Sequence, residues 1–203
     1  MTSLRHNRAE DAAPREPREV YLDAARDCIL DVGWRRTTLT EVARRAGVSR
    51  MTIYRTWADM STLLGDLMTR EWAGVVDAQV ESDRGKPAIE RISNGIVGTV
   101  QALRVNELFV RIVEVDPELI LPYLFSRRGR SQELILAVTT EAIKEGQASG
   151  EIRRDTAVGI GRALLLAAQG FVLSAHTMVD EQVSLEELDA ELALLISRML
   201  ERP

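Results

Sequence analysis

Five side chains between residues 50 and 55 carry the groups with which proteins contact nucleic acids. Arg50 and Arg55 offer guanidinium groups, Tyr54 a phenol, and Met51 and Thr52 methyl groups. A guanidinium can donate two hydrogen bonds to guanine, which gives roughly 1–3 kcal/mol of discrimination. It can instead hold a phosphate, which positions the protein without specifying a sequence. Both roles stay open for the two arginines, and the methyl groups suit contact with thymine.

Two short predicted helices position these side chains. The first begins at residues 38–41, Thr-Leu-Thr-Glu, whose spacing is that of a capping box. Its apolar residues recur at i, i+3, i+4 and i+7: Leu39, Val42, Ala43 and Ala46. Gly47 ends it, and Ser49 caps a second helix from Arg50 to Thr56. Two short helices joined by a tight, glycine-containing turn are typical of a helix-turn-helix, whose second helix enters the DNA major groove.

The local charge agrees with this interpretation. Between Arg35 and Ala58 there are six arginines and one acidic residue, a local net charge of +5 in a chain of net charge −5. A basic patch on an acidic protein confines the attraction for phosphates to one surface.

Composition predicts an all-α protein. The chain has 203 residues, 4% of them aromatic, few prolines and no sustained alternation of apolar and polar residues. Residues 1–17 mix charged residues and prolines, and we expect a disordered arm whose Arg5, Arg8 and Arg15 either enter a minor groove or stay solvated. The lone Cys28 is predicted to be a buried apolar side chain. With no signal peptide and no uninterrupted apolar run of membrane length, we expect a cytoplasmic protein without membrane contact.

The last two predicted helices carry the largest apolar surfaces. One runs from Asp155 or Thr156 to about Met178 and is apolar nearly all round, which predicts burial on more than one side. The other opens with the capping box at residues 184–187. Together they predict a homodimer through a four-helix bundle, unless both simply complete the core of one chain. The predicted interface residues are Leu164, Ala168, Phe171, Val172, Leu185, Leu188, Leu192, Leu195 and Met199.

The block from Ala24 to Leu64 resembles the TetR family of bacterial transcriptional regulators. Its sequence is AARDCILDVGWRRTTLTEVARRAGVSRMTIYRTWADMSTLL, with the specific parts G-W-x-x-T-T, E-V-A-x-x-A-G-V-S and T-I-Y-x-x-W. The resemblance implies a homodimer whose N-terminal three-helix bundle binds a palindromic operator. It also implies a C-terminal helical domain that binds a small molecule and dimerises, and, in most members, repression relieved by that molecule. By position it implies DNA contacts from Thr38, Arg50, Met51, Thr52, Tyr54 and Arg55, to which we add Arg36 and Thr40.

One position departs from the family. Many members have a phosphate-binding lysine at the start of the fourth helix, where this chain has Met60 after Asp59. The neighbouring Trp57 stands where phenylalanine is commoner. Candidates to replace the missing phosphate contact are Arg35, Arg36, Arg44 and Arg45.

We predict three segments: the arm at 1–17, a helix-turn-helix domain at 18–60, and a ligand-binding and dimerisation domain at 61–203. The candidate pocket residues are Trp72, Ile96, Phe109, Tyr123, Phe125 and Phe171, with Arg111, Gln169 and His176 as polar contacts. Any of the apolar ones could equally be core. A small, mostly apolar effector is the default, since few buried polar groups are on offer.

Catalytic and metal motifs are missing from the sequence. It contains no GxSxG, HExxH or GxxxxGK[ST], and two histidines with one cysteine do not make a zinc site. We therefore expect no enzyme activity, metal or cofactor, and a ligand-responsive dimeric repressor. Its ligand would tilt the fourth helix, so that the recognition helices no longer match half-sites roughly 34–36 Å apart. The alternatives are a DNA-binding regulator without a small-molecule effector, and a helical binding module or enzyme with an incidental basic motif.

Overall fold

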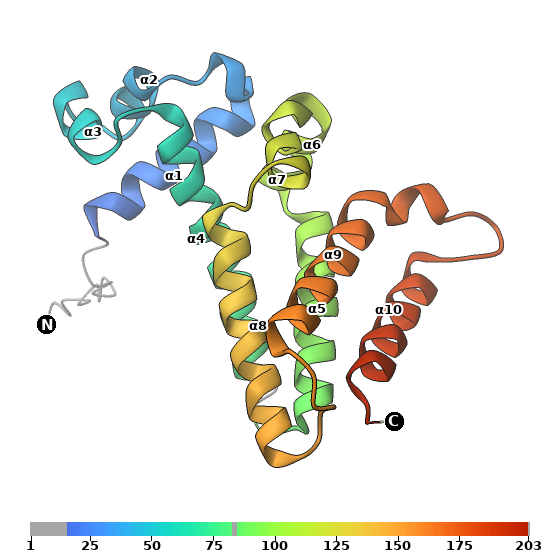
Figure 1. Cartoon of the computed structure of the whole chain (residues 1–203). Helices are drawn as coiled ribbons and strands as arrows, with labels where there is room; N and C mark the ends of the chain where they lie inside the picture. Colours follow the sequence, from blue (N-terminus) through green and yellow to red (C-terminus); the bar gives the residue numbers. More distant parts are fainter. Residues whose placement is uncertain (1–15, 83–84, 203) are drawn as a thin grey trace, which may run out of the picture.

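The computed structural model describes residues 16–82 and 85–202, except for the side chains of residues 76–82. Over these ranges the regular structure is helical throughout, which confirms the all-α prediction. Figure 1 shows α1 to α3 at one end of the molecule and the long helices extending away from them. The α-helices are α1 (Pro17–Val32), α2 (Leu39–Arg45), α3 (Arg50–Thr56), α4 (Met60–Ser82), α5 (Ala88–Val105), α6 (Glu107–Val115), α7 (Leu121–Phe125), α8 (Arg130–Ser149), α9 (Ala157–Ser174) and α10 (Leu185–Leu200). Three 3₁₀ turns join them: η1 (Trp34–Arg36), η2 (Pro117–Leu119) and η3 (Ala175–Met178). The predicted arm, with Arg5, Arg8 and Arg15, lies outside the described residues up to residue 15.

Helices α1 to α3 pack around one apolar core. Ile29 of α1, Val42 of α2 and Ile53 of α3 are fully buried in it, together with Trp57. Cys28 lies in this core, as predicted. The same core takes in Leu63, Leu64 and Leu67 of α4 and Leu108 and Ile112 of α6. The start of α4 therefore belongs to the packing of the N-terminal bundle as well as to the C-terminal helices.

The ends of α2 and α3 follow the sequence signals in part. The Thr38 hydroxyl accepts from the Glu41 amide at 3.2 Å, and the Ser49 hydroxyl accepts from the Thr52 amide at 3.2 Å. The Glu41 carboxylate does not reach back to complete the predicted capping box, because Arg44 binds both of its oxygens at 2.6 and 3.0 Å. Gly47 has φ +69°, the left-handed conformation expected at this turn.

A second apolar core joins the C-terminal helices. It contains Val100 of α5, Ile143 of α8, Ile160 of α9 and Ile196 of α10, all of them buried. Helix α8 packs against α9, and α5 packs against α4, α8, α9 and α10. Figure 1 shows α10 beside α5, at the edge farthest from α4.

The prediction that α9 is buried on more than one side is wrong for the single chain. Its buried residues are Ala157, Ile160, Gly161 and Leu164, which lie on one face, whereas Leu166 is 69% exposed. By length and composition the segment Ala157–Met178 could cross a membrane, although only 22% of its apolar 18-residue window is buried. An apolar helix open on one face is also what a protein–protein interface leaves on a separated subunit.

Two residues predicted at a subunit interface lie in the core of the chain itself. Leu164 and Leu192 are 1% and 0% exposed and pack among α5, α9 and α10. The buried face of α10 runs through Asp189, Leu192, Ile196 and Leu200, because packing against α5 rotates the helix away from the predicted stripe. Leu185 and Leu195 remain 39% and 47% exposed.

Candidate DNA-binding surface and ligand cavity

Helix α3 presents the predicted contact residues on its outer face. Arg50, Tyr54 and Arg55 are exposed, and Met51 is 76% exposed. Thr52 is half-buried, and its hydroxyl lies 2.9 Å from the Ser49 hydroxyl, close to the start of the helix. The other predicted contacts lie nearby in sequence: Arg36 in η1, Thr38 at the cap of α2, and Thr40 on its first turn.

The arginines of this region divide into two groups. Arg35 pairs with Glu118 at 2.6 Å, Arg44 with Glu41 at 2.6 Å, and Arg45 with Asp31 at 2.6 Å. In contrast, Arg36, Arg50 and Arg55 form no ion pair with any residue of the described ranges. Of the four candidates to replace the missing phosphate contact, Arg36 is therefore the one whose charge is not already offset by an acidic neighbour.

At the start of α4, where many TetR-family members bind phosphate, Met60 and Asp59 instead pack against the core and cap the helix. Met60 is half-buried against the N-terminal core. The Asp59 carboxylate caps α4, accepting from the amide and the hydroxyl of Thr62 at 2.7 and 2.9 Å. These bonds hold the pKa of Asp59 below its ordinary value despite a small opposing contribution from burial.

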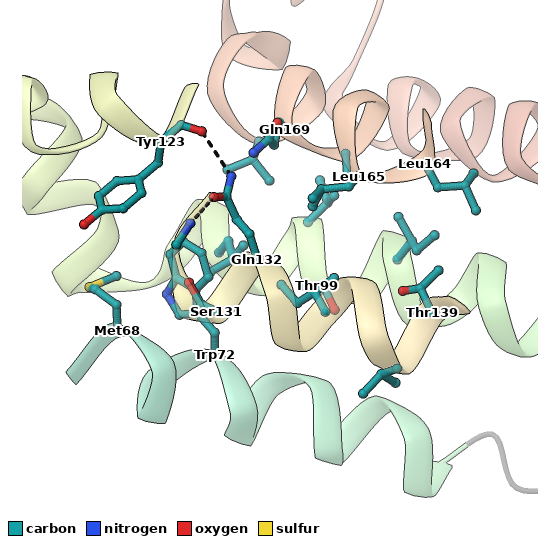
Figure 2. A pocket seen from close by; sticks show the side chains of 18 of the residues that line it. Met68, Trp72, Thr99, Tyr123, Ser131, Gln132, Thr139, Leu164, Leu165 and Gln169 are labelled. Atoms are coloured by element: carbon teal, nitrogen blue, oxygen red, sulfur yellow. Dashed lines mark hydrogen bonds between the residues drawn. The ribbon is translucent and has the colours of Figure 1, made fainter. Parts of the chain in front are cut away.

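A cavity of about 700 Å³ lies between α4, α5, α8 and α9, and residues of α6, η2 and α7 also line it. Figure 2 shows Met68 and Trp72 of α4, Thr99 of α5 and Leu165 of α9 around it. Its walls are predominantly apolar. Five of the predicted pocket residues line it: Trp72, Ile96, Phe109, Tyr123 and Gln169.

Four predicted pocket residues lie elsewhere. Phe125, at the end of the short α7, is 79% exposed, and His176 is exposed on η3 beyond the end of α9. Phe171 packs against the C-terminal core, and Arg111 is half-buried on α6 away from the cavity walls. These aromatic and polar side chains are of kinds that often line pockets, but their positions on the helices place them outside this one.

Sequence reasoning missed several polar residues of the cavity wall, chiefly Ser131 and Gln132 of α8. The Gln132 side chain is buried, accepts from the Gly129 amide at 2.7 Å and donates to the Tyr123 carbonyl at 3.2 Å (Figure 2). Gln132 stands three residues after Gly129, the residue that precedes α8. A glutamine at this position is a known helix-capping signal, so the sequence alone could have indicated its role. The Trp72 indole N–H is buried without a partner among the described residues.

A second cluster joins the cavity wall to the N-terminal bundle through Asp66 of α4. Its carboxylate accepts from the Trp57 indole N–H at 2.6 Å, from Arg130 at 2.6 Å and from Arg18. Arg130 and Gly65 both line the cavity, and Trp57 ends the recognition helix. Burial by itself raises the pKa of Asp66, but the bonds from Trp57 and Arg18 and the charges of Arg18 and Arg130 outweigh it and lower the pKa below the ordinary value.

Asp116 connects η1 to the end of α6, beside the N-terminal core. The sequence Asp116-Pro117 predicts a helix start with a capping Asp and a Pro at the first position. Pro117 does begin a helical segment, the 3₁₀ turn η2, but the predicted cap is wrong, because the Asp116 side chain accepts no capping bond. The buried Asp116 carboxylate instead accepts from the Trp34 amide at 3.0 Å and lies 3.4 Å from Arg35. It thereby fixes η1, and with it Arg36, against α6.

The N-terminal part of the chain matches a known family of proteins. The sequence model described as "Bacterial regulatory proteins, tetR family" matches residues 22–67. The chain is 31% identical over 193 residues to an uncharacterized HTH-type transcriptional regulator from Mycobacterium bovis, and the match covers 95% of each chain.

Solved structures share the fold. The R. erythropolis transcriptional repressor QsdR matches with a TM-score of 0.65 and 18% identity, over 92% of this chain and 97% of that one. The repressor AlkX from Dietzia sp., implicated in biodegradation of n-alkanes, matches with a TM-score of 0.65 and 21% identity, over 92% and 96%. The chain belongs to the TetR family of bacterial regulatory proteins and is a DNA-binding transcriptional regulator.

Proposed function

We propose that the protein is a homodimeric repressor that binds a palindromic operator and is released from it by a small, largely apolar ligand. The observation that carries the DNA-binding half is the outer face of α3, where Arg50 and Arg55 have no acidic partner among the described residues. Residues 18–60 would form the DNA-binding domain and residues 61–203 the ligand-binding and dimerisation domain.

The open faces of α9 and α10 support a dimer. Leu166 of α9 and Leu194 and Leu195 of α10 are between 47% and 69% exposed. Apolar side chains this open on two neighbouring helices are unfavourable in water, and pairing them with the same surface of a second chain buries them in a four-helix bundle. Ala168, Phe171, Val172, Leu188 and Met199 are half-buried on the same two helices and would extend the interface.

The cavity supports a small-molecule effector over a regulator that lacks one. Its volume of about 700 Å³ lies within the roughly 300–1,000 Å³ range of ligand pockets. The repressor AlkX, which shares the fold, is implicated in biodegradation of n-alkanes, which are apolar molecules. For the effector of this chain we propose only the same apolar character.

The position of α4 provides the route from ligand to DNA. Its first turns, with Leu63 and Leu67, are part of the N-terminal core, and its next turns, with Met68 and Trp72, line the cavity. A ligand that displaces α4 from α5 and α8 therefore changes the orientation of the N-terminal bundle relative to the C-terminal helices. In a dimer this alters the spacing of the recognition helices, which must match half-sites roughly 34–36 Å apart.

Selection of bound sequences from a random duplex pool, at two salt concentrations, tests the proposal. We expect a palindromic consensus whose binding weakens steeply with salt, because arginine–phosphate contacts release counterions. Arg50→Ala should relax the preference at one position of each half-site, with a loss of roughly 1–3 kcal/mol if the arginine reads guanine. The matched control is Arg154→Ala, which removes an exposed arginine far along the chain.

Two outcomes would count against the proposal, and a third would change the role of Arg50. An asymmetric consensus would contradict binding of the operator by a symmetric dimer. No enrichment over background would favour the alternative of a helical binding module or enzyme whose basic motif is incidental. A uniform loss of affinity in Arg50→Ala, with the consensus unchanged, would make Arg50 a phosphate contact.

A further inference from the structure

The positive and negative charges of the cavity wall offset each other at one end of the cavity but not at the other. The wall contains two arginines, Arg91 and Arg130, and two glutamates, Glu141 and Glu145. Arg91 and both glutamates share one end, where Arg91 Nη2 lies 3.4 Å from Glu145 and Lys144 lies 2.6 Å from Glu141. Each charge at that end therefore has an opposite charge close by.

The end beside the N-terminal bundle carries an excess of positive charge. Arg130 pairs there with Asp66, but Asp66 also pairs with Arg18, so that two guanidinium groups share one carboxylate. Arg127 is close to the same end, with its guanidinium 5.1 Å from the centre of the Tyr123 ring, and Tyr123 is part of the cavity wall. An anion bound at this end would offset a charge that the described residues leave uncompensated.

We infer that the effector is an amphiphile with a carboxylate-type anionic head and an apolar tail, and that its head binds Arg130. The inference rests on the proposed function and specifies the ligand class of the same cavity. The tail would occupy the apolar space between α4, α5, α8 and α9.

The geometry of Arg130 suits this role. Its side chain is 62% exposed, and Asp66 engages only Nη1, at 2.6 Å. A guanidinium carries further donors in a planar fork that matches a carboxylate. The neighbouring wall residue is Gly65, and a Cβ added there would lie 3.8 Å from Arg130 Nη2. No side chain at position 65 therefore separates the guanidinium from α4.

Binding of an anion to Arg130 would compete with Asp66. The same carboxylate accepts from the Trp57 indole N–H at 2.6 Å and holds Arg18, whose guanidinium lies 5.8 Å from the centre of the Trp57 ring. Weakening the Arg130–Asp66 pair loosens the connection of α8 to the residue that ends the recognition helix. Since coupling is reciprocal, operator DNA should weaken binding of the anion by the same factor.

Calorimetric titration of the full chain with dodecanoate and dodecan-1-ol, both below their aggregation limits, tests the head group at constant tail. We expect the acid to bind at least about tenfold tighter than the alcohol, the size of one charge-assisted hydrogen bond. Arg130→Gln should remove that preference and leave the alcohol within about twofold of its original affinity. Arg154→Gln, which removes an exposed arginine that does not line the cavity, should keep the preference.

A second variant covers the case in which Arg130→Gln does not fold. Arg130→Lys keeps the charge but loses the planar fork, and should keep only part of the preference for the acid. Equal binding of acid and alcohol to the original chain, failure of both to bind, or full preference in both Arg130 variants would overturn the inference.

Operator release separates this inference from the proposed function. A chain that binds its selected operator and is released by the alcohol but not by the acid remains a ligand-responsive repressor without an anionic effector. A chain that binds no sequence selectively rejects the proposed function whatever the titrations show.

Discussion

Among the described residues, few charged side chains connect the N-terminal bundle to the cavity wall, and Asp66 makes the most contacts of these. Its side chain is 10% exposed and accepts from Trp57, Arg18 and Arg130, which belong to three different parts of the chain. A nearly buried carboxylate is costly to ionise unless donors surround it, and here the donors are also the connection between the recognition helix and the cavity.

The first prediction concerns the pH dependence of Asp66. Folding lowers the pKa of this carboxyl below its ordinary value of 3.8, so the unfolded chain binds the proton more tightly than the folded one. The stabilisation is therefore complete above the unfolded pKa and is lost as the pH falls through the folded pKa. Asp66→Asn should cost about 1–2 kcal/mol at neutral pH, since both arginines are half exposed or more and solvent screens them.

Urea unfolding of both proteins between about pH 6 and pH 3 measures the difference. The gap in unfolding free energy should shrink toward acid, because only the original chain loses the Asp66 contribution there. Glu114→Gln removes an exposed carboxylate of α6 and serves as the control. A gap that stays constant with pH would show that Asp66 does not stabilise the fold through its charge.

At the scale of elements, short helices depend on their ends more than long ones do. Helices α2 and α3 have seven residues each, too few to be stable alone. Thr38 and Ser49 cap their starts, and Gly47 makes the turn between them with φ +69°. Ile53 and Trp57 then bind the recognition helix to the core, so that its outer face is held in place.

The second prediction separates backbone strain from packing at Gly47. A Cβ at Gly47 would meet nothing within 4 Å, so Gly47→Ala adds no clash, only the cost of a left-handed conformation, roughly 1–2 kcal/mol. Gly74 also has nothing within 4 Å but lies inside α4. Gly74→Ala should therefore leave the stability unchanged or raise it by up to about 1 kcal/mol.

The two variants are compared by urea unfolding at one temperature. Opposite signs are expected from the same chemical change, because only the backbone conformation differs. A Gly47→Ala protein as stable as the original would mean that the turn tolerates another conformation.

At the scale of the whole molecule, the chain has an exposed apolar surface on α9 and a large internal cavity. The face of α9 around Leu166 has no cover, and the cavity of about 700 Å³ lies behind the opposite face of the same helix. If α9 also forms the dimer interface, one helix borders both the ligand and the partner chain. A change in the cavity could then reach both DNA-binding domains through α4 and through the interface.

The third prediction tests that interface. Leu166→Glu places a charge on the exposed face of α9 and should convert a dimer into monomers of 22.6 kDa at micromolar concentration. Phe125→Glu makes a similar change at a residue that is 79% exposed on α7, away from that face, and should leave the dimer intact.

Light scattering after size-exclusion chromatography gives the mass of each variant. Operator affinity should fall with the loss of the dimer, since two half-sites are no longer bound together. If Leu166→Glu kept twice the chain mass, α9 would not form the interface. A monomeric original chain would reject the dimer itself.

The sequence alone determined what depends on local spacing. The helix-turn-helix could be predicted because its signals are near neighbours: Thr38 caps the amide of Glu41, Ser49 that of Thr52, and Gly47 takes the left-handed turn. Helix propensity and apolar periodicity act over a few residues, so the all-α fold was also accessible.

Tertiary structure decided which faces of those helices meet. Periodicity shows that a helix has an apolar face, but the rotation that buries Leu164 and Leu192 and leaves Leu166 open depends on neighbours distant in sequence. For the same reason Phe125 has the right type for a pocket and lies outside it. The contact of Asp66 with Arg130, 64 residues away, has no local signal, because only the packing of α8 beside α4 brings the two charges together.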